Sequence, residues 1–319
     1  MYYKTNMSIK SATTQKIFQS MPNPIMAECD YMECEILNAL FEDKSAFDTL
    51  VFSGGATLRK SYNICQRASH DIDLATNEFE ELPMARSRCR LKKHVANFKE
   101  FVFDVLMPRI NYAINQDKRF MLSNDREWRA LHNPEQQTSY PTLHVLYQSA
   151  LNRMFQHICI EIIPRKYDKD TINYSAVTPY STREPMGVIP TVAYEQTFWD
   201  KMFALNSFAT IGKPKNRFFL SRHYYDVATL MPFVNLRDTR HMLQNTVLYQ
   251  QIYTTKNIPA IHSPADLSLR PAPAVLLELK QDYDAMREEF LGVPPQWVEI
   301  MTKLETLQAR CNKINGQGR

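Results

Sequence analysis

The chain has 319 residues, of which 44% are hydrophobic and 23% charged, and its formal net charge is +4. This length favours two domains or one large one, and this composition is typical of a globular protein. The sequence has no run of about 18 apolar residues, and residues 1–10 are polar, so we expect a cytoplasmic protein without a membrane span or secretion signal.

The six cysteines and eight histidines are scattered along the chain, and no C-x-x-C pair is present. Zinc ribbons and thiol redox motifs need closely spaced thiols. We therefore expect reduced cysteines that pack as small apolar residues, and no zinc site built from the histidines.

The first half of the chain predicts a mixture of helices and strands. Apolar residues at helical spacing predict a helix that begins at Pro24, with Asn23 as its N-cap, and runs through Phe41. A short buried strand over residues 49–53 then ends at a glycine pair. The following stretches predict a helix over 56–65, a strand over 71–75 and a long helix over 84–118 whose first turns are basic.

The second half begins with two strands and continues as helices. Residues 142–147 and 157–163 predict antiparallel strands, and Pro164 ends the second. We expect residues 164–191 to be irregular or short-stranded and to cross between domains. Helical patterns follow at 192–209, 216–231, 236–254, 273–291 and 294–314, with a proline-rich loop at 263–273. The fold class is thus α/β (α+β): a mixed domain over 1–190 and an all-helical domain over 191–319.

Three carboxylates on two of these strands predict a metal site. Asp71 and Asp73 are two residues apart, so they point to the same face of their strand. Glu161 lies inside an apolar strand, where an ionised carboxylate is costly unless it is paired or binds a metal. Hard oxygen ligands suit Mg²⁺, and three carboxylates on neighbouring strands can hold two such ions for attack on a phosphate.

A glycine pair lies just before these carboxylates in the sequence. The chain has only seven glycines, and Gly54 and Gly55 stand side by side between the predicted strand and helix. Glycine leaves the backbone N–H groups unobstructed, and a helix N-terminus attracts anions. The turn therefore predicts a binding site for a triphosphate.

Together these segments resemble the AbiEii toxin family within the DNA polymerase beta-like nucleotidyltransferases. That family carries G-G-x-x-L-x-K followed by R-x-S-x-D-I-D-L, and the matching residues here are Gly54, Gly55, Leu58, Lys60, Arg67, Ser69, Asp71, Ile72, Asp73 and Leu74. His70 departs from the acidic residue common at its position. Two later segments, residues 194–205 and 222–227, are similar to the family's E-x…K-x-x-A-L and R-H-x-x-D-h motifs, and the resemblance covers roughly residues 50 to 232.

The resemblance implies a polymerase beta-like domain with a small mixed sheet that transfers a nucleoside monophosphate from an NTP. It implies Mg²⁺ as cofactor, tRNA or another RNA as acceptor, and a phage-defence toxin with a cognate antitoxin. The implied catalytic residues are Asp71, Asp73, Glu161, Lys201 and Asp226, the first three of which bind metal. The implied nucleotide-binding residues are Ser53, Gly54, Gly55, Thr57, Lys60, Arg67, Ser69 and Arg222.

Plainer interpretations of several residues stay open. Lys201 is also consistent with a helix lysine that reaches to solvent, and Arg222 and Asp226 with an ion pair within one helix. Lys60 and Arg67 are equally consistent with solvated surface residues, and the basic stretch 86–94 with a solvated helix face rather than an RNA contact. The rival functions are transfer to a small molecule or a protein side chain, and non-catalytic binding of nucleotide or RNA by the same fold.

Overall fold

The computed structural model describes residues 12–42, 49–69, 71–79, 88–116, 118–124, 141–212, 218–253 and 260–314. The described chain forms two compact units. The first contains the described residues within 12–62, 68–79 and 89–192, and the second contains residues 63–67, residue 88 and the described residues from 193 onward. None of the described helices is both long and apolar enough to cross a membrane.

The first unit is built on a mixed sheet, in which the described strands are arranged in the order β3-β4-β5-β2-β1-β7-β6. Their bounds are β1 (Leu50–Ser53), β2 (Asp71–Thr76), β3 (Met121–Asn124), β4 (Thr142–Gln148), β5 (Phe155–Pro164), β6 (Ile172–Val177) and β7 (Gly187–Val192). The pairs β2–β5 and β1–β7 are parallel, and the other neighbours are antiparallel.

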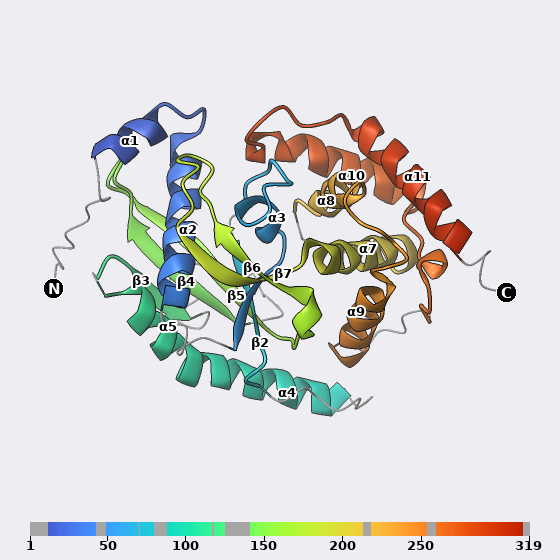
Figure 1. Cartoon of the computed structure of the whole chain (residues 1–319), viewed down its shortest axis with the longest axis horizontal. Coiled ribbons are helices and arrows are strands. Elements are labelled where there is room, and N and C mark those ends of the chain that lie inside the picture. Colours follow the sequence, from blue (N-terminus) through green and yellow to red (C-terminus); the bar gives the residue numbers. More distant parts are fainter. Residues whose placement is uncertain are drawn as a thin grey trace. The chain divides into compact units, whose positions relative to one another are not determined.

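Helices cover one face of this sheet (Figure 1). They are α2 (Pro24–Glu42), α4 (Arg88–Phe101), the π-helix Val102–Leu106 and α5 (Met107–Ile114), while α1 (Ala12–Gln19) packs on α2. Alternate residues of the central strands, such as Ile72, Leu74 and Ile160, are fully or almost fully buried in this core. The strand residues between them point to the opposite face, which is where the predicted metal ligands Asp71, Asp73 and Glu161 lie.

The predicted helix at Pro24 is present, and Asn23 caps it as predicted. The Asn23 Oδ1 atom accepts a hydrogen bond from the Met26 N–H at 3.2 Å, which satisfies one of the N–H groups of the first turn. The antiparallel strands predicted around residues 142–163 are also present, and the second ends at Pro164 as expected.

Two predicted helices of the first unit differ from the structure. The helix expected over 56–65 is only the single turn α3 (Thr57–Lys60), and Asn63, at φ 52°, takes a left-handed conformation that a helix does not tolerate. The long helix expected over 84–118 is interrupted by the π-helix and ends at Ile114. Pro108 follows this π-helix, so the wider turn accommodates a residue that lacks an N–H donor. Residues 84–87 lie outside the described part.

Residues 164–191 are short-stranded, as predicted, but they do not cross between domains. They form the hairpin of β6 and β7 within the first unit, preceded by the short 3₁₀ turn Lys169–Thr171. Strand β7 joins the sheet beside β1 through a parallel pairing of Phe52 with Thr191. That pairing depends on residues far apart in sequence, so local patterns did not reveal it.

The second unit is helical, as predicted. Its helices are α7 (Tyr194–Thr210), α8 (Arg222–Leu230), α9 (Arg240–Tyr253), α10 (Pro273–Ala285) and α11 (Trp297–Ile314), with 3₁₀ turns at Pro264–Asp266 and Met286–Glu289. Helix α7 packs against α8 and α9 around Trp199, whose indole Nε1 donates a hydrogen bond to the Thr239 hydroxyl at 3.0 Å. Helix α8 begins six residues later than predicted, because Phe219 lies at φ 58° just before it.

Candidate active site

The three predicted metal ligands lie on the face of the sheet opposite the helices of the first unit. Asp73 on β2 is the direct Cα partner of Glu161 on the parallel strand β5, and Asp71 precedes Asp73 by two residues. All three are partly exposed, whereas the residues between them are buried. Within the described chain their carboxylate oxygens are not all within 4.8 Å of one another. Repulsion between ionised carboxylates favours such spacing, and a divalent cation would offset it.

The glycine turn lies directly against Asp73. Gly54 has φ +75°, and a Cβ atom built on it would lie 1.7 Å from Oδ2 of Asp73. No other residue fits at this position without moving that carboxylate, because the backbone conformation and the contact both require glycine. We call Asp71, Asp73 and Glu161 the carboxylate row. Through Asp73, the turn and the carboxylate row form one local structure.

Hydroxyl groups hold this turn in place. The Thr57 hydroxyl donates to the carbonyl oxygen of Gly54 at 2.8 Å, and the Ser53 hydroxyl donates to the carbonyl oxygen of Asp73 at 3.3 Å. Both side chains are buried. In this structure they shape the turn rather than face outward. Because α3 is a single turn, the predicted contribution of a helix N-terminus to phosphate binding is smaller than expected.

Ser69 lies just before strand β2, which carries Asp71 and Asp73. Its hydroxyl donates to the Asp71 carbonyl oxygen at 3.5 Å, and it is partly exposed. His70, which departs from the family pattern, lies outside the described residues. Ser69 thus lies two residues before Asp71, at the N-terminal end of β2.

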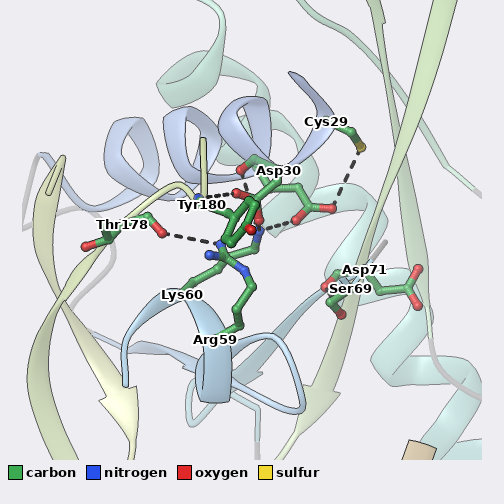
Figure 2. Close-up of polar contacts among 9 residues, drawn as sticks. Cys29, Asp30, Arg59, Lys60, Ser69, Asp71, Thr178 and Tyr180 are labelled. Carbon is green, nitrogen blue, oxygen red and sulfur yellow. Dashed lines mark hydrogen bonds and ion pairs between the residues drawn. The ribbon is translucent and has the colours of Figure 1, made fainter. Parts of the chain in front are cut away.

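Lys60 is enclosed in a buried ionic cluster (Figure 2). Its ammonium lies 2.5 Å from a carboxylate oxygen of Asp30 and 2.5 Å from one of Glu33, and its side chain has no exposed surface. Arg59 contacts the same Asp30 at 2.5 Å. These contacts fasten the turn after Gly55 to helix α2, so the alternative of a solvated surface lysine is wrong. The predicted phosphate contact of Lys60 stays a prediction.

The charges in this cluster set the ionisation of Asp30. Burial alone would raise its pKa, but the neighbouring cations Lys60 and Arg59 outweigh burial and lower the pKa below its usual value. The Tyr180 N–H also donates to Asp30 at 2.8 Å. Our sequence interpretation missed Asp30 and Glu33. The signal that it overlooked is that the helix carries several acidic residues and no basic one, so its buried carboxylates need cations from elsewhere in the chain.

A second buried ionic cluster lies in the helical unit. Asp226 on α8 accepts two hydrogen bonds of 2.7 Å from Arg67, and the ammonium of Lys201 on α7 lies 2.8 Å from the same carboxylate. Burial favours the neutral acid, but the two cations outweigh it and hold the pKa of Asp226 well below its usual value. Arg67 and Lys201 therefore neutralise a buried carboxylate.

The alternative of an Arg222–Asp226 ion pair within the helix is not what the structure shows. Asp226 directs its carboxylate to Arg67 and Lys201, and in the described part of the chain Arg222 makes no ion pair with it. Arg222 is partly exposed at the first turn of α8. Its predicted contact with nucleotide stays a prediction.

The face of the sheet that carries the three carboxylates also carries a group that our sequence interpretation missed. Cys159, on β5, is the Cα partner of Asp71 on one side and of His144 on the other, and His157 precedes Cys159 by two residues. The signal was present in the two predicted strands, because an antiparallel pairing of them brings scattered histidines and a cysteine onto one face.

Comparison with known proteins identifies the family. The family model described as nucleotidyl transferase AbiEii toxin, type IV TA system, matches residues 35–308. No curated protein matches the chain. Among solved structures, the chain is similar to JHP933 from Helicobacter pylori, with 14% identity, 97% of each chain covered and a TM-score of 0.45. Since the family model spans most of the sequence, including both strands of the carboxylate row, the chain belongs to the AbiEii family of nucleotidyl transferase toxins of type IV toxin–antitoxin systems.

Proposed function

We propose that the protein transfers a nucleoside monophosphate from an NTP to a hydroxyl group of RNA, with tRNA as the preferred acceptor. The acceptor oxygen attacks the α-phosphorus, and the bond between the α-phosphorus and the oxygen bridging to the β-phosphate breaks. Pyrophosphate leaves with the electron pair of that bond. The observation that carries the proposal is the register of Asp73 with Glu161, immediately beside the Gly54 turn.

The donor set on this face fits Mg²⁺. Asp71, Asp73 and Glu161 offer only carboxylate oxygens, which are the hard ligands that Mg²⁺ prefers, and their partial exposure leaves room for water and phosphate oxygens. In the proposal they hold two Mg²⁺ ions. When bound, these ions would stabilise the charge on the attacking and leaving oxygens.

The residues of the chain have separate roles in this proposal. Glu161 accepts the proton of the attacking hydroxyl, in addition to binding metal. The backbone of Gly54 and Gly55 holds the triphosphate, with Ser53 and Thr57 fixing the shape of the turn. The predicted catalytic roles of Lys201 and Asp226 are not needed for the bond changes. The same holds for the predicted nucleotide contacts of Arg67, Ser69 and Arg222.

Exposed cations on α4 support an RNA acceptor. Arg90, Lys92 and Lys93 are exposed on the first turns of this helix, in the unit that carries the carboxylates. Clustered cations attract the phosphate backbone because binding releases condensed counterions. Arg86, which begins the predicted basic stretch, lies outside the described residues. Because the family consists of toxins, we also propose a cognate antitoxin and a role in phage defence.

The test is a transfer assay with the purified protein, Mg²⁺, each labelled NTP in turn and total bacterial tRNA. We expect label on tRNA with the native protein and none with the Asp73→Asn or Glu161→Gln variants. The matched control is Asp104→Asn, which removes an exposed carboxylate from the π-helix and should leave transfer unchanged.

Other outcomes would redirect the proposal. Label on a small molecule or on protein, with none on RNA, would keep the chemistry and replace the acceptor. NTP binding without any transfer would favour a non-catalytic binding protein. Full transfer by Asp73→Asn would show that the carboxylate row does not carry the reaction.

A further inference from the structure

A group of soft and borderline metal ligands lies on the same face of the sheet as the carboxylate row. The Nδ1 atom of His144 lies 2.8 Å from Nε2 of His157, and the Cys159 sulfur lies 4.0 Å and 3.6 Å from these two nitrogens. All three ligand atoms are within 4.8 Å of one another. They are held by β4 and β5, which are central strands, so the backbone positions are fixed by sheet pairing.

These separations approach those of a tetrahedral zinc site. In a tetrahedral site, zinc–nitrogen bonds of about 2.1 Å and zinc–sulfur bonds of about 2.3 Å place two nitrogens roughly 3.4 Å apart and a nitrogen and sulfur roughly 3.6 Å apart. The nitrogen–sulfur distance to His157, 3.6 Å, equals this value, and the distance to His144, 4.0 Å, exceeds it slightly. The 2.8 Å nitrogen–nitrogen distance is shorter, and a rotation of the accessible His157 ring would widen it.

We propose that His144, His157 and Cys159 bind a Zn²⁺-class divalent cation, with the fourth coordination position open to water or an anionic oxygen. Two imidazoles and a thiolate select zinc over Mg²⁺, whereas the neighbouring carboxylates have the opposite preference. Cys159 is the Cα partner of Asp71, so the two donor sets occupy adjoining positions on one face. The zinc site does not depend on the proposed nucleotidyl transfer.

The alternative is a simple hydrogen bond between the two imidazoles, with the thiol beside it. The rings are nearly parallel, at an interplanar angle of 13° and a centroid separation of 5.0 Å. Such a pair would satisfy one nitrogen of each ring without any metal. A metal site and a hydrogen-bonded pair differ in one observable respect, because only the metal site engages the Cys159 sulfur in a coordinate bond.

Cobalt titration tests this difference. The full chain, with any affinity tag removed, is treated with chelator, kept reduced and titrated with Co²⁺. We expect one equivalent to produce the visible bands of tetrahedral cobalt and a near-ultraviolet thiolate-to-cobalt charge-transfer band, both removed by added Zn²⁺. Cys159→Ser should lose the charge-transfer band, while Cys89→Ser, which changes an exposed cysteine on α4, should keep it.

Further variants distinguish loss of this metal site from changes in the carboxylate row and from misfolding. His157→Ala should weaken cobalt binding by more than the roughly 10–100-fold that loss of an outer-shell partner costs. Asp73→Asn should leave the cobalt spectrum unchanged, whatever its effect on transfer. Circular dichroism melting establishes that each variant is folded. Cobalt binding without a charge-transfer band, the same band in folded Cys159→Ser, or no stoichiometric binding by the native chain would each overturn the proposal.

Discussion

At the scale of single residues, Gly54 is the position where the geometry is least tolerant of substitution. Its φ of +75° is unfavourable for any side chain, and a Cβ atom there would overlap the Asp73 carboxylate. For Gly54→Ala we expect a fall in kcat/KM of about 100-fold or more, because a displacement of about 1 Å in a reacting group has that effect. The measurement is the rate of labelled nucleotide transfer to tRNA.

Gly212 provides the matched control for this variant. It also has a positive φ, +97°, but a Cβ atom there would meet nothing within 4 Å. We expect Gly212→Ala to cost about 1–3 kcal/mol of stability through backbone strain and to leave transfer unchanged. Equal losses of activity in the two variants would show that strain, rather than the contact with Asp73, is responsible.

A substitution of Lys60 distinguishes a structural role of this residue from a nucleotide-binding role. Replacing it by methionine leaves Asp30 and Glu33 buried with one cation fewer, so we expect Lys60→Met to lower the free energy of unfolding by about 3–5 kcal/mol. Urea unfolding measures this loss, and the KM for NTP should stay unchanged. Adding Glu33→Gln to the variant should restore part of the stability, since it removes one uncompensated charge. An increased KM with unchanged stability would instead favour the phosphate contact.

At the scale of elements, Asp226 joins α7, α8 and the segment 63–67 through its two cations. Its pKa is lowered in the folded state, so its contribution to stability is complete above the unfolded pKa of about 3.9 and is lost as the pH falls below that value. We therefore expect the free energy difference between the native protein and Asp226→Asn to be roughly 3–5 kcal/mol at neutral pH and to shrink below about pH 4.

Urea unfolding across this pH range measures the Asp226 effect. The control is Asp284→Asn, which removes an exposed ion pair with Lys280 within α10. Exposed pairs of this kind contribute about 0.3–0.5 kcal/mol, so its effect should be small at every pH. If Asp226→Asn destabilised the protein equally at all pH values, loss of packing rather than loss of charge would be its cause.

The elements also show what the sequence can and cannot predict. The strand at Asp71 and the helix at Pro24 were predictable, because alternating or helical apolar patterns are local. The π-helix before Pro108 and the pairing of β7 with β1 were not, because they depend on tertiary packing. Within the site, the shared face of Asp71 and Asp73 follows from strand geometry. The enclosure of Lys60 depends on α2, so residue spacing near Lys60 did not reveal it.

At the scale of the whole molecule, the proposed RNA acceptor predicts a specific dependence on salt. Replacing Arg90, Lys92 and Lys93 by glutamine should reduce the slope of log Kobs against log salt by about 2, since each single-strand phosphate contact contributes roughly 0.7. Fluorescence anisotropy with labelled tRNA measures this slope. The control replaces three exposed cations of α11, namely Lys303, Arg310 and Lys313. A larger change in the control would place the RNA contact on α11 instead.

The order of strands in the sheet has a consequence for biosynthesis. The carboxylate row joins β2 to β5, and β1 is completed by β7, so the pairings that build the site connect distant parts of the chain. Such non-local pairings form slowly and late in folding. A polypeptide whose synthesis stops before Glu161 lacks the third carboxylate altogether. Because β7 ends at Val192, a fragment of interrupted translation that stops before this strand cannot complete the pairings that build the site.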